Sequence, residues 1–156
     1  MADTGYTYMG FLLDYKKYGR LEGSATVAEV NRLESSLKVK LPLAYKEALL
    51  ILGMRSGFRL GPENSFAYPD FKGMQAAAEK IFTTGKIALE KNDFVFCCFL
   101  ETGFVWFFKL DEGPNPPVYQ YEEYSGEYTK AADSLTVFVK ETAWYKGYLL
   151  MKRDAR

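Results

Sequence analysis

Two apolar runs in the second half of the chain constrain its fold more than any other feature. They are "FVFCCFL" (residues 94–100) and "FVWFFKL" (104–110), and both are rich in aromatic and β-branched residues. Runs of this length and composition are typical of strands, and the intervening Glu101, Thr102 and Gly103 predict an antiparallel hairpin. Because each run is apolar on both faces at its centre, we expect the hairpin to lie mid-sheet with helices covering it.

Two well-delimited helices are predicted earlier in the chain, over residues 27–38 and 42–52. Thr26 and Glu29 form a capping box before the first. Pro42 suits the first turn of the second, and Gly53 suits its end. The short connection between them predicts a helical hairpin. The inward-facing positions are predicted to be Val27, Val30, Leu33 and Leu37 in the first helix and Tyr45, Leu49 and Leu52 in the second.

Two further helices are predicted before the strands. The first covers residues 6–19, and the second covers about 72–82 with Asp70 as its cap and Gly85 as its end. Residues 54–71, just before the second of these helices, are loop-like, with a short strand around 58–60. The apolar stripes of the two helices are Tyr8, Phe11, Leu12 and Tyr15, and Met74, Ala77, Ala78 and Ile81.

After the hairpin, residues 118–124 ("VYQYEEY") alternate and predict a third, more exposed strand. A last helix follows, capped by Asp133 or Ser134 and running to about Leu150. Helices, then a meander of strands, then a helix predict an α+β fold with an antiparallel or mixed sheet on which the last helix packs. The inward-facing residues of that helix are predicted to be Leu135, Phe138, Val139 and Thr142.

The length of 156 residues is that of one ordinary domain, so we expect a single domain over residues 1–156. Its core is expected at about 26–145, with an N-terminal helix and connector over 1–23 and a basic tail over 151–156. An acidic N-terminus without a basic region differs from a secretory signal, and no run approaches the ~18 apolar residues of a membrane span. These features, with only two cysteines, predict a cytoplasmic protein.

The absence of histidine excludes several classes of site. Ser-His-Asp and Cys-His catalysis and His-containing zinc sites are impossible within this chain. The adjacent Cys97 and Cys98 should point to opposite faces of a strand and lie buried, where an apolar setting raises the pKa of a thiol. We therefore expect no catalytic residues, no metal site and no cofactor. The zero net charge gives no overall field that favours nucleic acid or an anionic membrane.

One segment combines acidic residues with tyrosines. Residues 110–129 contain no Lys or Arg, and acids alternate there with Tyr119, Tyr121, Tyr124 and Tyr128. Tyrosine is well suited to protein interfaces, and an acidic face complements a basic partner. A solvated sheet edge and a carboxylate-based enzyme or small-ligand site are the alternatives, although nothing fixes an opposed catalytic pair. The candidate partner-binding residues are Tyr119, Tyr121, Glu122, Glu123, Tyr124 and Glu127.

Several fragments together resemble the SUKH superfamily. A helix carrying Glu34 precedes "LPLAYKEALL" (41–50), the most specific fragment, and the aromatic hairpin with Gly103-Phe104 follows. Next come Pro117-Val118-Tyr119 and a Ser-Leu-x-x-Phe helix at 134–138, so the resemblance spans about residues 26–145. The chain differs from the usual pattern at Ala44, Ala48, Leu52 and Glu101-Thr102.

The resemblance implies a binding protein rather than an enzyme. Bacterial members of the superfamily act largely as immunity proteins, each of which binds a cognate toxin, often a nuclease, and blocks it. A fungal member regulates cell-wall glucan synthesis, so a regulator or scaffold of envelope metabolism is the alternative. The resemblance implies no metal or cofactor, and its expected partner is a toxin domain rather than nucleic acid or membrane.

Overall fold

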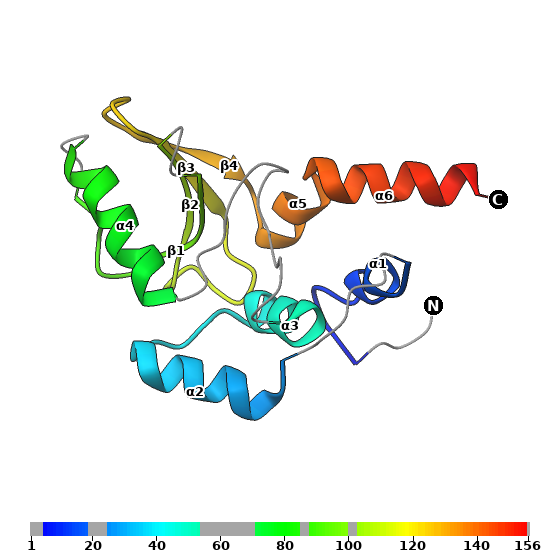
Figure 1. The fold of residues 1–156 in the computed structure, drawn as a ribbon. Coiled ribbons are helices and arrows are strands. Elements are labelled where there is room, and N and C mark those ends of the chain that lie inside the picture. Colours follow the sequence, from blue (N-terminus) through cyan, green and yellow to red (C-terminus); the bar gives the residue numbers. More distant parts are fainter. Residues whose placement is uncertain (1–4, 19–24, 54–70, 85–87, 100–102, 156) are drawn as a thin grey trace.

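A computed structural model describes residues 5–18, 25–53, 71–84, 88–99 and 103–155 (Figure 1). The predicted short strand at 58–60 and the predicted cap Asp70 and stop Gly85 lie outside these residues. The helices are α1 (Leu12–Tyr18), α2 (Val27–Leu37), α3 (Leu43–Leu52), α4 (Phe71–Thr84), α5 (Leu135–Lys140) and α6 (Ala143–Asp154). The strands are β1 (Asp93–Phe99), β2 (Phe104–Lys109), β3 (Val118–Glu122) and β4 (Tyr128–Ala132).

The strands form one antiparallel sheet in the order β1-β2-β3-β4, which confirms the predicted α+β fold. The aromatic hairpin is β1–β2, with Phe94 opposite Phe108 and Cys98 opposite Val105. The third strand is present and more exposed than β2. The hairpin does not lie wholly mid-sheet as predicted. In the sheet of the described residues, β1 is an edge strand, and β2 is the internal strand of the hairpin. β4 was not predicted.

A side chain from α4 covers the outer edge of β1. The amide of Gln75 donates to the carbonyl oxygen of Val95 at 2.6 Å and accepts the Val95 backbone N–H at 3.1 Å. One side chain thus supplies the donor and the acceptor that a neighbouring strand would supply. The outward N–H and C=O groups of Val95, in the middle of an apolar strand, are therefore satisfied without a neighbouring strand.

The sheet lies between helices on both faces (Figure 1). On one face Ile81 and Phe82 of α4 pack against the sheet around Phe107, and on the other α3 and α5 build the larger core around Tyr45. A bulge near Phe96 places that residue and Cys97 in the larger core. Cys98 lies in the smaller core, so the prediction that the cysteines are buried on opposite faces is confirmed.

The predicted boundaries of α2 and α3 are largely confirmed. Thr26 caps α2 by accepting the Glu29 backbone N–H at 3.1 Å, and its hydroxyl donates to the Glu29 carboxylate at 3.3 Å. Pro42 lies just before the first turn of α3, and Gly53 ends that helix at φ 89°. Tyr45, Leu49 and Leu52 are buried as predicted. The predicted burial of Val27 is wrong, because its side chain is 65% exposed on the solvent side of the first turn.

The single C-terminal helix predicted from the sequence is two helices. Ser134 caps α5 by accepting the Val137 backbone N–H at 3.1 Å, and Thr142 is the N-cap of α6. The predicted inward-facing residues Leu135, Phe138, Val139 and Thr142 are all buried. α6 continues to Asp154, past the predicted end near Leu150.

The two terminal helices pack against each other. Helix α1 begins at Leu12 rather than at residue 6, and Tyr15 contacts the rings of Trp144 and Tyr148 on α6. Asp14 accepts hydrogen bonds from Tyr148 and Lys152, and these bonds lower the pKa of its carboxyl group. The two ends of the described chain are therefore joined by an aromatic and ionic contact.

Candidate partner-binding surface

The six residues predicted to bind a partner divide into two tyrosines within β3 and four residues around the turn that follows it. Tyr121 is fully buried and its ring stacks on Phe82 of α4, so it cannot touch a partner. Tyr119 is half-buried, and its hydroxyl donates to the carboxylate of Glu112, whose oxygens are 2.9 and 3.0 Å away. Burial, followed by this bond, raises the pKa of Tyr119 to about 12. Tyr121 is thus part of the core, and Tyr119 is held within the sheet by its bond to Glu112.

The other four residues surround the turn between β3 and β4, and we call Glu122, Glu123, Tyr124 and Glu127 the acidic turn. Glu122 and Glu127 are exposed and Glu123 is half-buried. The side chain of Tyr124 is 75% exposed. The sequence grouped Tyr124 with Tyr121, because alternation alone did not separate the exposed tyrosine from the buried one.

Backbone and hydroxyl hydrogen bonds hold the acidic turn in one shape. The Ser125 backbone N–H donates to the Glu122 carbonyl oxygen at 3.0 Å, and the Ser125 hydroxyl donates to the Glu127 carbonyl oxygen at 2.8 Å. At its base the Glu123 N–H donates to the Gly103 carbonyl oxygen at 2.9 Å. The carboxylates are thus presented by a bonded turn, which reduces the entropy lost on binding.

Tyr124 has an unfavourable backbone conformation. Its φ is 71°, in the left-handed region that costs an L-residue roughly 1–2 kcal/mol. A bulky side chain in this region that makes little contact with the rest of the molecule gives no packing in return for that cost. Such outliers cluster at functional sites, so the conformation identifies Tyr124 as a candidate contact residue.

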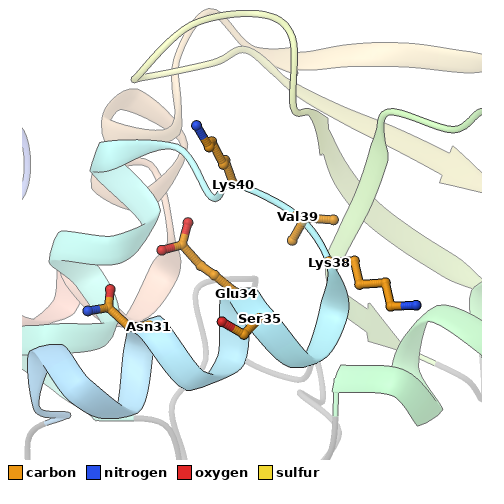
Figure 2. A pocket seen from close by; sticks show the side chains of 6 residues that line it. All are labelled: Asn31, Glu34, Ser35, Lys38, Val39 and Lys40. Atoms are coloured by element: carbon orange, nitrogen blue, oxygen red, sulfur yellow. The ribbon is translucent and has the colours of Figure 1, made fainter.

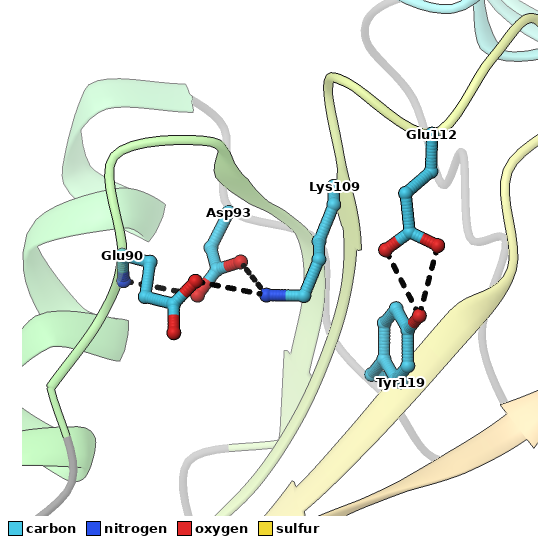
Figure 3. Close-up of polar contacts among 5 residues, drawn as sticks. All are labelled: Glu90, Asp93, Lys109, Glu112 and Tyr119. Atoms are coloured by element: carbon cyan, nitrogen blue, oxygen red, sulfur yellow. Dashed lines mark hydrogen bonds and ion pairs between the residues drawn. The ribbon is translucent and has the colours of Figure 1, made fainter.

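A cluster around Lys109 was missed in the sequence (Figure 3). It lies at the opposite end of β2 from the acidic turn, since Glu122 is opposite Phe104 and Asp93 is opposite Lys109. The Lys109 ammonium lies 2.6 Å from the Asp93 carboxylate and 3.4 Å from that of Glu90. It also lies 5.2–5.7 Å from the ring centroids of Phe107, Tyr119 and Tyr128. Burial by itself would lower the pKa of Lys109, but the bond and charge of Asp93 outweigh it and the net shift is upward.

The described residues also bear on the expectations for cysteine chemistry, metal binding and membrane insertion. Burial raises the pKa of the Cys98 thiol to about 11, as expected for an apolar strand. Among the described residues no three His, Cys, Asp or Glu side chains lie close enough together to hold a metal ion. Within the same residues, no helix is both long and apolar enough to cross a bilayer.

A second surface feature is an open pocket of about 490 Å³ at the end of α2 (Figure 2). Its most buried polar group is Glu34, whose carboxylate accepts the Leu41 backbone N–H at 2.7 Å and pairs with Lys46 at 3.6 Å. These bonds fix the connection between α2 and α3, so Glu34 is engaged in structure. The pocket is lined by Asn31, Glu34, Ser35, Lys38, Val39 and Lys40.

Comparison with known proteins places this sequence in a family. Neither the curated proteins nor the solved structures gave a significant match. The family comparison matches residues 24–141, which include the whole sheet, α2–α5 and the acidic turn, whereas α1 and α6 lie outside the matched range. Since the match covers well over half of the chain, the protein belongs to the SMI1/KNR4 family (SUKH-1).

Proposed function

We propose that this protein is an immunity protein that binds a cognate bacterial toxin and blocks its active site by direct contact. The SUKH-1 family includes immunity proteins, which supports the class of function. In this proposal the protein acts in the cytoplasm of the toxin-producing cell or its kin. It works by binding alone and without an enzymatic step.

The observation that carries the proposal is the acidic turn. It presents an exposed tyrosine in a strained backbone conformation, between carboxylates at Glu122, Glu123 and Glu127. A tyrosine offers a large contact area with few rotamers to freeze, and surrounding charges accelerate the capture of an oppositely charged partner. A toxin with a basic active-site cleft, such as a nuclease that binds phosphates, matches this surface.

Four acids that are buried or partly buried support a function without catalysis. Glu34, Glu47, Asp93 and Glu112 each accept hydrogen bonds from backbone or side-chain donors of the fold itself. A general acid or base needs reach to a substrate proton, and these carboxylates already have structural partners. Among the described residues, no hydrogen bond or ion pair engages the carboxylates of Glu122, Glu123 or Glu127 in the acidic turn.

Co-expression tests the proposed function. Each toxin domain encoded beside the gene is expressed in a sensitive host with and without the protein, and cell survival is measured. We expect rescue from one such toxin and a stable complex on co-purification. If no neighbouring toxin is neutralised, immunity is the wrong function, and regulation of envelope metabolism becomes the better hypothesis. A pull-down from the source cells with mass spectrometry then identifies the partner.

A further inference from the structure

The outer edge of β4 is open in the part of the chain that the structure describes. β4 is the last strand of the sheet and lies along its margin, with β3 on one side (Figure 1). Among the described residues, no hydrogen bond reaches the outward peptide groups of Tyr128 or Lys130. The side chains of residues 129–131 are exposed as well.

The sheet register identifies which peptide groups face outward. The Glu123 N–H, just after β3, donates to the carbonyl oxygen of Gly103. In an antiparallel pair every second residue bonds to the same neighbour, so Tyr121 and Tyr119 also direct their backbone groups toward β2. The residues between them, including Gln120, therefore bond to β4, where Gln120 is opposite Thr129. It follows that Thr129 bonds inward and that Tyr128 and Lys130 direct their N–H and C=O groups outward.

The two edges of the sheet are treated differently. At β1 the amide of Gln75 occupies the outward groups of Val95, as a neighbouring strand would. No described side chain does this at β4. Among the described residues, the outward groups of Val95 at one edge are therefore covered, whereas those of Tyr128 and Lys130 at the other edge are available to an added strand.

We propose that the β4 edge binds an extended, basic segment of a partner protein, which adds a fifth strand to the sheet. Residues 122–133 contain four acids, Glu122, Glu123, Glu127 and Asp133, against one base, Lys130. Backbone bonds to β4 supply affinity, and the flanking carboxylates select basic side chains. A second copy would bring two segments of equal negative charge together, which disfavours self-pairing. The identity of the partner as a toxin rests on the proposed function.

A designed peptide tests the edge directly. The full chain labelled with ¹⁵N is titrated with an acetylated and amidated peptide of four Thr-Lys repeats, and amide resonances are followed by NMR. A peptide of four Pro-Lys repeats has the same charge but cannot form the ladder. We expect the Thr-Lys peptide to shift the amides of 128–132 and to slow hydrogen exchange at Tyr128 and Lys130. The Pro-Lys peptide should leave both unchanged.

Two variants at Lys130 separate backbone pairing from charge. Lys130→Pro removes the outward N–H at a position where an edge strand tolerates proline, whereas Lys130→Ala keeps it. Both remove the exposed ion pair with Asp133. We expect Lys130→Pro to bind the Thr-Lys peptide at least about tenfold more weakly than Lys130→Ala, as loss of backbone hydrogen bonding predicts.

Equal binding by the two folded variants, or equal binding of the two peptides, would overturn the edge proposal. Protection of the Tyr128 and Lys130 amides in a dimer without peptide would overturn it too, since a second copy would then occupy the edge. If Lys130→Pro does not fold, the comparison of the two peptides on the wild type decides. These tests use no toxin. If the peptide experiments fail but co-expression rescues the cells, only the proposal of strand addition is excluded. If the peptide binds but no toxin is neutralised, the proposal for the β4 edge stands and the immunity function is excluded.

Discussion

The carboxylate of Glu47 in α3 accepts the backbone N–H of Tyr8 at 2.7 Å, joining residues 39 positions apart. The same carboxylate accepts the N–H groups of Thr7 at 2.9 Å and Met9 at 3.0 Å. Three consecutive amides before α1 are thus satisfied by one buried side chain. The Tyr8 carbonyl oxygen in turn accepts the Thr136 hydroxyl at 3.3 Å, so the N-terminal segment is tied to both α3 and α5.

Replacement of Glu47 should loosen this segment. Glu47→Ala leaves three amides without their acceptor, so we expect a loss of about 2–3 kcal/mol in the free energy of unfolding. Glu47→Gln keeps one acceptor oxygen and should lose less. Urea denaturation measures the loss, and hydrogen exchange should accelerate at Tyr8 and Met9. Glu79→Ala, on the exposed face of α4, is the control. If Glu47→Ala were as stable as this control, the three hydrogen bonds to Glu47 would contribute nothing to the free energy of unfolding.

Gly103 is expected to tolerate no side chain. Its φ is 71°, and a β-carbon there would collide with the β-carbon and carboxylate of Glu123. Gly103→Ala therefore combines backbone strain with a steric clash, and we expect a loss of at least about 2 kcal/mol. Gly126→Ala is a matched control, because its φ is 81° but nothing lies within 4 Å of the added carbon. It should lose only about 1 kcal/mol. Equal losses in thermal or urea unfolding would show that the clash is relieved at no cost.

Lys109 is expected to contribute to stability through its ion pair with Asp93, whose side chain is only 1% exposed. Lys109→Met leaves that carboxylate without its cation and should cost about 3 kcal/mol. Adding Asp93→Asn should recover part of the loss, since the amide oxygen can still accept the Glu90 N–H that Asp93 accepts at 3.0 Å. Urea denaturation of the two variants measures both effects. A double variant no more stable than Lys109→Met would contradict this account.

The pH dependence of the same pair has a definite sign. The pKa of Lys109 is raised in the folded protein above its ordinary value of 10.5. Its contribution to stability is therefore fully present below pH 10.5 and is lost as the pH rises through the folded-state value. The difference in unfolding free energy between wild type and Lys109→Met should stay constant from pH 7 to 9 and shrink above pH 10.5. A difference that shrinks below pH 9 would mean that the pair is not the source of the stability.

Features with strong local rules were predictable from the sequence. The capping box at Thr26, the glycine stop at Gly53 and the β1–β2 hairpin each follow from short-range chemistry, and all three are present. The separation of Cys97 and Cys98 follows from the two-residue period of a strand. Alternation also predicted a third strand. It could not show which of its tyrosines would be covered by α4.

Features that depend on tertiary partners were not predictable in this way. β4 has the sequence "YTKAA", which lacks the alternation of apolar residues that signals a strand, and pairing with β3 decides its conformation. Glu47 and Gln75 have the composition of solvated helix surface, and only the packed structure reveals the backbone groups they satisfy. The break at Thr142 was hidden because helical periodicity continues across it.

Tyr124 should favour binding at the expense of folding stability. Tyr124→Gly removes the side chain and relieves the left-handed strain, so we expect the fold to gain about 1 kcal/mol. The same substitution should weaken toxin binding by at least about tenfold if the tyrosine is an interface anchor. Urea denaturation measures the first effect and isothermal titration calorimetry the second. A glycine variant that binds the toxin as tightly as wild type would exclude Tyr124 from the interface.

Reversal of charge on the acidic turn should act mainly on the rate of association. Replacing Glu122, Glu123 and Glu127 by Lys repels a basic toxin, and we expect the association rate constant at low salt to fall by about tenfold or more. Binding that remains should be less weakened by added salt than binding of the wild type. Surface plasmon resonance at two salt concentrations measures both effects. The control variant changes Glu79, Asp111 and Asp154 to Lys, which alters the net charge equally at exposed sites outside the turn. If the two triple variants slow association equally, overall charge rather than the acidic turn guides the toxin, and the interface must lie elsewhere.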